Sequence, residues 1–330
     1  MKAGKIATRF GLPVVITVVI LYFFFRDISL SDIQGAFLRI PLTSILLFLL
    51  LSVSGTFLRA FKYHILLAKK LSFTDIFLIT LVRNFSVDLL PARTASLVFY
   101  SYLTKRKGIS LEEGASSFVV SVFYDTLALS VMLGGLVFFL KTEFNPTFIY
   151  IGMALIFAVS VVMIFCAEWV IALLLKIKIL HRFSRLVGVL QKIAAYLGEH
   201  RKGRERTVVF VLSLLIRLIK YVSVFVLFVG MVPVPVNMQY FSLFCFGLAG
   251  TELSSVLPIQ GAGGFGTWEL AFTLVFKSLQ FPMANIKLTG LLIHIITQAW
   301  EYLIGITAFL YMMLQGGAPK GEPETGNTVD

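Results

Sequence analysis

The feature that most constrains this chain is a series of long apolar runs separated by short basic clusters. Runs of this length can cross the hydrocarbon core of a bilayer, about 30 Å thick, as helices that rise about 1.5 Å per residue. Of the 330 residues, 58% are hydrophobic, and Lys and Arg total 29 against 17 Asp and Glu. Because the basic residues lie between the apolar runs, they indicate cytoplasmic loops rather than a nucleic-acid surface. We therefore expect a multi-pass protein of the inner (cytoplasmic) membrane, with no nucleic-acid partner.

Six of the runs predict full crossings by helices. They are residues 10–25, 41–70, 114–140, 147–175, 207–231 and 286–314. The basic clusters place both termini in the cytoplasm. We expect an all-α fold: one integral membrane domain over residues 1–314, a short outer connection over residues 26–40, and a disordered cytoplasmic tail over residues 315–330.

Residues 176–206 differ from the crossings because they are rich in Lys and Arg. Their apolar residues, among them Leu186, Leu190, Ile193 and Leu197, recur at helical spacing. This pattern predicts a cytoplasmic amphipathic helix at the lipid surface, and a solvated linker is the alternative.

Residues 249–271 form a break inside an otherwise apolar region. Pro258 is followed by Gly261, Gly263, Gly264 and Gly266, and such a combination interrupts a helix. Within a membrane, broken backbone is tolerated only where protein buries it or water reaches it. The break therefore predicts a binding site, at the turn of a re-entrant hairpin that enters from outside.

Residues 71–104 predict a second re-entrant hairpin. Both flanks of this apolar segment are basic, which a single crossing does not satisfy. Pro91 and several polar residues lie in its middle, so we expect a hairpin that enters from the cytoplasm and whose second helix starts near Pro91. The alternative is that both hairpins are ordinary helix pairs and the loop assignment is wrong by one crossing.

The two hairpins belong to an internal repeat. Arg59, Lys62 and Tyr63 match Arg217, Lys220 and Tyr221; Leu90-Pro91 matches Leu257-Pro258; and Tyr124-Asp125 matches Trp300-Glu301. The shared order predicts repeat 1 over about residues 41–140 and repeat 2 over about residues 207–314. Because the hairpins enter from opposite sides, the repeats are expected to be inverted, as in many transporters.

Charged residues within the apolar runs are the candidate site residues. Charges at bilayer depth cost several kcal/mol unless they are paired or hydrated, so they are expected to meet inside the helix bundle. Ser117, Ser121 and Asp125 share one helix face, and His294, Gln298 and Glu301 share another. The candidates for binding a phosphate headgroup are Arg59, Lys62, Arg93, Arg217 and Lys220, with Gly261, Gly263 and Gly264 allowing close backbone approach. The candidate charge partners or proton carriers are Asp125, Glu252, Glu269, Glu301 and His294.

Two observations favour an anionic ligand. Each hairpin's second helix begins at depth with exposed backbone N–H groups and the positive end of its dipole, and the basic residues add positive charge. The alternative is that these charges form structural salt bridges and bind nothing.

Motifs for catalysis, cofactors or metals are absent from the sequence. It contains no nucleophile elbow, P-loop or zinc signature, and both cysteines, Cys166 and Cys245, lie in apolar segments. The glycine spacing of residues 261–266 follows an apolar helix rather than a strand, so it does not predict a dinucleotide site. We expect no catalytic residue, no cofactor and no metal.

Three segments together resemble the lysylphosphatidylglycerol synthase transmembrane region, also called the flippase-like domain family. They are residues 84–93, the pair Tyr124-Asp125, and residues 258–269, of which the glycine-rich run ending in Glu269 is the most specific. The resemblance covers nearly the whole chain and implies movement of lipids between leaflets, such as aminoacylated phosphatidylglycerol or isoprenoid-linked glycolipids. Around Pro91-Ala-Arg93 the chain departs from the family pattern, which keeps a role for Arg93 but supplies no acidic group there.

The resemblance also bears on enzymatic activity. Family members that attach lysine to phosphatidylglycerol use a soluble C-terminal domain, and this chain ends about 16 residues after its last predicted helix, so we expect that domain to be missing. The preferred hypothesis is a lipid translocase whose partners are membrane lipids with phosphate-bearing headgroups. Two alternatives remain: a scaffold for a lipid-synthesising enzyme or glycosyltransferase, and a lipid headgroup transferase.

Overall fold

A computed structural model describes residues 26–87, 89, 94–140, 203–253, 261–281 and 285–315, with isolated positions at 15–22 and 151–195. This part of the chain is helical and contains no strand. Four of its helices are long and apolar enough to cross a membrane: α3 (Leu42–Leu66), α6 (Leu111–Leu136, extended by a 3-10 turn over Val137–Phe139), α10 (Gly203–Val229) and α13 (Ile286–Gln315). The chain is therefore an all-helical, multi-pass membrane protein, as predicted.

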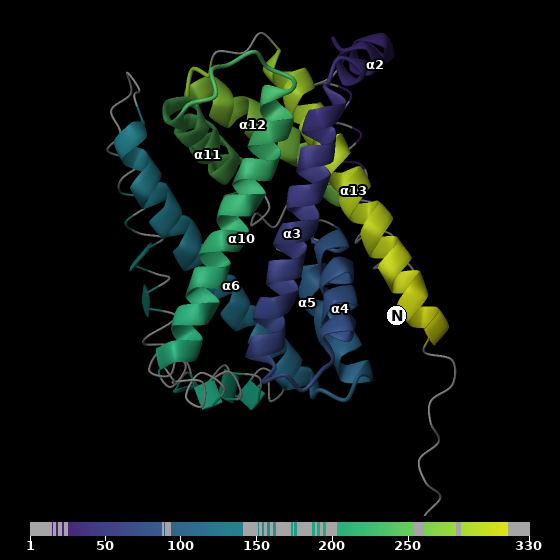
Figure 1. Ribbon diagram of the computed structural model, residues 1–330, viewed down its shortest axis with the longest axis vertical. Coiled ribbons are helices and arrows are strands. Elements are labelled where there is room, and N and C mark those ends of the chain that lie inside the picture. Colours follow the sequence, from purple (N-terminus) through teal and green to yellow (C-terminus); the bar gives the residue numbers. More distant parts are fainter. Residues whose placement is uncertain are drawn as a thin grey trace, which may run out of the picture.

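Two pairs of shorter helices lie at opposite ends of the long ones (Figure 1). Helices α4 (Phe73–Phe85) and α5 (Thr94–Arg106) lie at the end where α3 terminates. Helices α11 (Met238–Glu252) and α12 (Thr267–Ser278) lie at the end where α3 begins. The long helices α3 and α10 pack against each other, and α13 packs against both α4 and α12. Each short pair is thus held by long helices from both halves of the chain.

Side-chain caps explain where several helices begin. The side chains of Ser72, Ser110 and Asn237 accept hydrogen bonds from backbone N–H groups in the first turns of α4, α6 and α11. These bonds satisfy donors that have no partner within the helix. The polar residues between apolar runs therefore set the helix starts.

The connection over residues 26–40 contains one more helix, α2 (Leu30–Leu38), which was not predicted from the sequence. Ser29 and Asp32 form a reciprocal capping box at its start: the Asp32 backbone N–H donates to Ser29 Oγ, and the Ser29 backbone N–H donates to an Asp32 carboxylate oxygen. This spacing was the available sequence signal.

The predicted break at the glycine cluster is confirmed. Helix α11 ends at Glu252 and α12 begins at Thr267, with a 3-10 turn over Ala262–Gly264 between them. Gly263 and Gly266 have φ angles of 62° and 87°, in the left-handed region where a side chain is strained. Glycine is therefore required for the chain to turn into α12.

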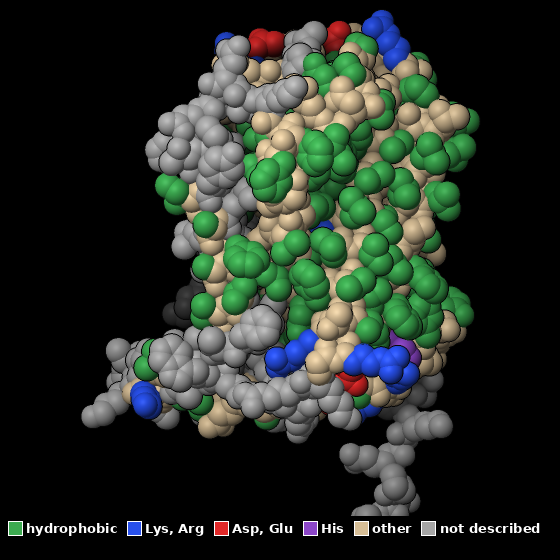
Figure 2. Space-filling view, turned by 60° about the vertical axis from the view of Figure 1, so that its left-hand side comes forward, with side chains coloured by type: hydrophobic (Ala, Val, Ile, Leu, Met, Phe, Trp, Pro, Cys, Tyr) green, Lys and Arg blue, Asp and Glu red, His purple; other side chains and the backbone are tan. Residues whose placement is uncertain are grey.

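The described surface fits a lipid environment. Figure 2 shows a broad band of hydrophobic side chains on one face, with charged side chains toward its two rims. Exposed apolar residues include Leu50 and Phe57 on α3 and Leu215 on α10. Two buried apolar clusters, one around Tyr63 and Tyr100 and one around four phenylalanines (Phe228, Phe244, Phe272 and Phe276), form the core.

Some predictions concern residues outside the described part of the chain. These are the first crossing (10–25), most of the crossing over 147–175 and of the basic segment over 176–206, and the tail after residue 315. Asp88, Pro91, Arg93 and Pro258 also lie outside it.

Candidate anion-binding cavity

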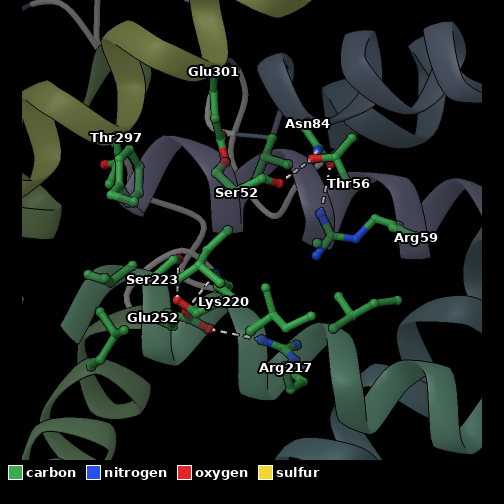
Figure 3. Close-up of a pocket in the computed structure, with 18 of the residues that line it drawn as sticks. Ser52, Thr56, Arg59, Asn84, Arg217, Lys220, Ser223, Glu252, Thr297 and Glu301 are labelled. Atoms are coloured by element: carbon green, nitrogen blue, oxygen red, sulfur yellow. Dashed lines mark hydrogen bonds and ion pairs between the residues drawn. The ribbon is translucent and has the colours of Figure 1, made fainter. Parts of the chain in front are cut away.

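A cavity of about 160 Å³ lies where the short helices end against the long ones. Long helices α3, α6, α10 and α13 and short helices α4, α11 and α12 all contribute to its lining. Asn84 reaches it from the last turn of α4, and Glu252 reaches it from the last residue of α11 (Figure 3). Residues from both halves of the chain therefore line the cavity.

Arg59 and Arg83 converge on one neutral acceptor. Asn84 Oδ1 accepts hydrogen bonds from Arg59 Nη1 at 2.9 Å and from Arg83 Nη1 at 3.1 Å. Asn84 Nδ2 donates to Thr56 Oγ1 at 3.1 Å, and Thr56 Oγ1 donates to the Ser52 carbonyl oxygen. This chain of bonds orients the amide, with its oxygen toward the two guanidinium groups.

In the part of the chain that the structure describes, Arg59 and Arg83 share a neutral acceptor, and the nearby carboxylate of Asp125 is already paired with Lys62. Neither Arg59 nor Arg83 forms an ion pair with a described residue, and the Nε atom of each is buried without a hydrogen-bond partner there. Arg83 is only 5% exposed, and its guanidinium lies 5.4 Å from the centroid of the Phe118 ring. Buried charges are ordinarily paired, so two guanidiniums on one amide oxygen indicate room for an anion.

The cations of the second half have a different partner. Arg217 Nη1 lies 3.2 Å from Glu252 Oε2, and Lys220 Nζ lies 2.6 Å from Glu252 Oε1. Arg217 Nε also donates to the backbone carbonyl of Asp125 at 3.2 Å. A carboxylate thus already partners both of these cations (Figure 3).

Lys62 and Asp125 form a separate internal ion pair. Lys62 Nζ lies 2.5 Å from Asp125 Oδ1 and donates to Ser213 Oγ at 3.1 Å. The Lys62 side chain is fully buried, so this pair ties α3 to α6 and α10 away from solvent. Ser117, Ser121 and Asp125 are all buried, in agreement with the inward face predicted for this helix.

Glu269 and His294 form a third buried pair. His294 Nδ1 lies 2.6 Å from Glu269 Oε1, while Glu269 Oε2 accepts the Gly266 backbone N–H at 2.7 Å. The His294 ring stacks on Phe265 and Trp268, with centroids 4.5 and 4.8 Å apart. This pair joins the start of α12 to α13.

The structure brings together most, but not all, of the candidate residues. Those that line the cavity are Arg59, Asp125, Arg217, Lys220, Glu252, His294 and Glu301. Glu301 points into it from α13 in Figure 3. Lys62, Glu269 and the glycines Gly261, Gly263 and Gly264 lie outside this lining.

Gly263 has a packing role instead. A Cβ atom at Gly263 would lie 2.8 Å from the Tyr302 hydroxyl, so the glycine allows the turn to approach α13 closely. This is the close backbone approach that the sequence predicted, toward another helix rather than toward the cavity.

Arg83 and Asn84 line the cavity but were not among the headgroup candidates named from the sequence. Arg83 is one of the charged residues in apolar segments that the sequence predicts to meet inside the helix bundle. Asn84 opens one of the segments that carry the family resemblance, and this signal could have identified it. Their joint position became visible only when α4 was packed against α3, where Arg59 lies.

The described lining carries four cations and three acids. The cations are Arg59, Arg83, Arg217 and Lys220, and the acids are Asp125, Glu252 and Glu301. Within the described ranges, no group of three or more His, Cys, Asp or Glu side chains could hold a metal ion. The arrangement suits a phosphate or another anion, because arginine pairs with such groups through two parallel hydrogen bonds.

Comparison with known proteins agrees with the helical, membrane-spanning architecture. No curated protein matches the chain. The family model described as "Lysylphosphatidylglycerol synthase TM region" matches residues 11–305, which include every element of the cavity described above. The chain therefore belongs to the lysylphosphatidylglycerol synthase transmembrane region family.

Proposed function

We propose that this protein is a lipid translocase that moves a phosphate-bearing lipid between the leaflets of the inner (cytoplasmic) membrane. The observation that carries the proposal is the pair Arg59 and Arg83, which share the Asn84 amide oxygen inside a cavity between the two halves of the chain. A phosphate at this point would gain charge-assisted hydrogen bonds and balance the buried Arg83 and the partly buried Arg59.

The placement of the short helices supports this function. We propose that α4–α5 and α11–α12 are re-entrant hairpins. Each helix of α4–α5 has 13 residues, or about 20 Å at 1.5 Å per residue, which is too short to span the bilayer core. The α5 end carries Lys105 and Arg106, which favour the cytoplasmic side. The other hairpin lies at the opposite end (Figure 1), so the two repeats would be inverted. We also propose that both termini are cytoplasmic, on the basis of the basic clusters in the sequence.

The position of the cavity suits alternating access. In transporters with inverted repeats, the substrate site lies near the midplane at discontinuous helices, and the two repeats rock about it. Here the cavity lies at the inner ends of both hairpins, with Asn84 from one and Glu252 from the other. Opening toward each side in turn would carry a bound headgroup across the membrane.

The lining also suits an amphipathic ligand. Beside the arginines it contains apolar side chains, among them Leu51 and Ile219 on the facing helices α3 and α10. A headgroup at Arg59 could therefore keep its acyl chains against apolar surface. A small soluble anion would gain nothing from that surface.

The test is lipid movement by the purified full chain in vesicles of phosphatidylcholine and phosphatidylglycerol. Fluorescent phosphatidate, phosphatidylglycerol and phosphatidylcholine are added as probes, and a membrane-impermeant quencher reports the fraction in the outer leaflet. The wild type is expected to move the two anionic probes faster than phosphatidylcholine. Arg59→Ala and Arg83→Ala should each slow that movement at least tenfold, because each removes one of the two cations that share the Asn84 oxygen.

The matched control is Arg39→Ala, since Arg39 is an exposed arginine just after α2 and outside the cavity. If folded Arg59→Ala and Arg83→Ala proteins moved the anionic probes as fast as this control, the cavity would not be the headgroup site. Because no partner enzyme is present, movement by the purified chain also separates transport from a scaffold role. Mass spectrometry of the same lipids would reveal any headgroup transfer.

A further inference from the structure

Three acids inside the described helix bundle differ in their partners. Asp125 is paired with Lys62, and Glu252 is paired with Arg217 and Lys220. Glu269 differs, because no described Lys or Arg forms an ion pair with it and its side-chain partner is His294. Among these three pairs, Glu269–His294 is therefore the one whose basic partner is an imidazole, the side chain that proteins commonly use to bind and release protons.

The contacts of Glu269 guide the assignment of the histidine tautomer. The Gly266 N–H donates to Oε2, and His294 Nδ1 lies 2.6 Å from Oε1, where the tautomer decides which of the two atoms donates. We assign Glu269 as a carboxylate that accepts on both oxygens, which places the proton on Nδ1. In this assignment His294 Nε2 holds a lone pair in the neutral ring.

That lone pair is buried without a partner. His294 is 2% exposed, it lines the cavity, and Nε2 has no hydrogen-bond partner in the described part of the chain. Buried polar atoms without a partner are rare and ordinarily have a reason. The ring is held in place by stacking on Phe265 and Trp268.

We propose that His294, held by Glu269, is a proton-binding site that couples lipid movement to the proton gradient, with one proton and one anionic headgroup bound together. The inference rests on the proposed function and adds its energy source. One proton binds the Nε2 lone pair on one side of the membrane and leaves it on the other. The charge of the Glu269–His294 pair thereby changes from −1 to 0 and returns to −1.

The electrostatics of the cavity set the sign of this coupling. His294 shares the cavity with charged residues from six helices. The cations are Arg59 on α3, Arg83 on α4, and Arg217 and Lys220 on α10; the acids are Asp125 on α6, Glu252 on α11 and Glu301 on α13. Arg59 and Arg83 line the same cavity as His294, and a bound phosphate would offset their positive charge. In this proposal the phosphate and a proton on His294 therefore favour each other's binding. By reciprocity, protonation of His294 favours binding of the phosphate.

The direction of transport follows from this sign. A proton and a headgroup that favour each other's binding cross the membrane together. A proton gradient directed into the cytoplasm would therefore drive the lipid from the outer to the inner leaflet. Competition between proton and headgroup would instead give exchange in opposite directions.

A binding experiment tests the coupling without transport. In a Trp169→Phe/Trp300→Phe background, Trp268 is the remaining tryptophan, and protonation of the stacked His294 should quench its fluorescence. Dihexanoyl phosphatidate should raise the midpoint pH of this quenching by about one unit, which corresponds to tenfold coupling. Dihexanoyl phosphatidylcholine should leave the midpoint unchanged.

The variants make this result specific. His294→Gln should abolish the pH-dependent quenching, whereas the matched control His64→Gln, at the end of α3, should retain it. A midpoint lowered by phosphatidate would mean competition and would overturn the proposed symport. An unchanged midpoint would overturn coupling altogether.

A transport experiment separates the inference from the function beneath it. In vesicles with equal pH on both sides, the wild type should equilibrate fluorescent phosphatidate between leaflets. With a pH gradient, the probe should accumulate in the leaflet facing the alkaline side, whichever way the protein is inserted. His294→Gln should lose the accumulation at any rate of probe movement that it retains, whereas the control His64→Gln should keep it. Equilibration by the wild type without accumulation would contradict only the proton coupling. No movement of the probe at all would contradict both the coupling and the proposed lipid translocation.

Discussion

The two halves of this protein place a polar residue at the same point and use it differently. Asn84 lies in the last turn of α4 and accepts hydrogen bonds from Arg59 and Arg83. Glu252 ends α11 and pairs with Arg217 and Lys220. Among the described residues, Arg59 and Arg83 of the first half thus share a neutral acceptor, while Arg217 and Lys220 of the second half share a carboxylate. Under the proposed function, the first half binds the headgroup and the second half supports it.

The lysines of the repeated motif differ in the same way. Lys62 is fully buried and pairs with Asp125, whereas the Lys220 side chain is 40% exposed and pairs with Glu252. A buried pair holds the bundle together, because breaking it leaves an uncompensated charge. A half-exposed pair is screened by solvent and contributes less.

The largest expected effect comes from breaking the buried pair. Lys62→Ala should lower the free energy of unfolding by about 3–5 kcal/mol, because Asp125 would remain buried without its cation. Lys220→Ala should cost about 1 kcal/mol or less. Denaturation of the two purified variants in one detergent checks this difference. Equal losses of unfolding free energy would mean that the two lysines stabilise the fold equally, which would contradict the comparison above.

The next largest effect is expected from a substitution that makes the first half resemble the second. Asn84→Asp places a carboxylate between Arg59 and Arg83 and should weaken binding of dihexanoyl phosphatidate about 10–100-fold, the worth of a charge-assisted hydrogen bond of about 1.5–3 kcal/mol. Titration calorimetry measures the affinity. Asn285→Asp, at an exposed cap of α13, is the matched control and should bind like the wild type. Unchanged affinity in Asn84→Asp would remove Arg59 and Arg83 from the headgroup site.

The reverse substitution tests the supporting half. Glu252→Gln removes the carboxylate shared by Arg217 and Lys220, so affinity for the same phosphatidate should rise about tenfold, or about 1.4 kcal/mol. Glu113→Gln removes the carboxylate of an exposed ion pair with Lys70 and is the matched control. A folded Glu252→Gln protein with weaker binding would show that Glu252 positions the ligand rather than neutralising cations.

The smallest effect concerns the anchoring of the first hairpin. Asp75 at the start of α4 lies 2.6 Å from Lys107, just after α5. Partial burial raises the pKa of Asp75, but hydrogen bonds from Lys107 and Ser72 outweigh it and leave the pKa below its usual value. The stabilisation is therefore present above the ordinary Asp pKa and is lost as the pH falls through the lowered one.

Asp75→Asn should consequently flatten the acid limb of the stability–pH profile by less than about 1 kcal/mol, since the pair is partly exposed. Thermal unfolding between pH 3 and 7, compared with the wild type, measures this change. A profile identical to that of the wild type would show that the pair does not anchor the hairpin.

The sequence by itself determined the four long helices and the glycine-rich break. Apolar runs predicted α3, α6, α10 and α13, because a bilayer admits only backbone that satisfies its own hydrogen bonds. The glycine cluster predicted the break before α12, and the four-residue spacing of Ser117, Ser121 and Asp125 predicted a buried face. These are local properties, decided by neighbours within a few turns of helix.

The tertiary structure alone decided which charge meets which. Lys62 pairs with Asp125, 63 positions away; Arg217 pairs with Glu252, 35 away; and His294 pairs with Glu269, 25 away. Arg59 and Arg83 instead share a neutral acceptor, Asn84 Oδ1, although several acids lie in the apolar segments of the sequence. The physical reason is that bilayer depth forces buried charges to find partners, while the packing of helices from both halves determines which partners are within reach.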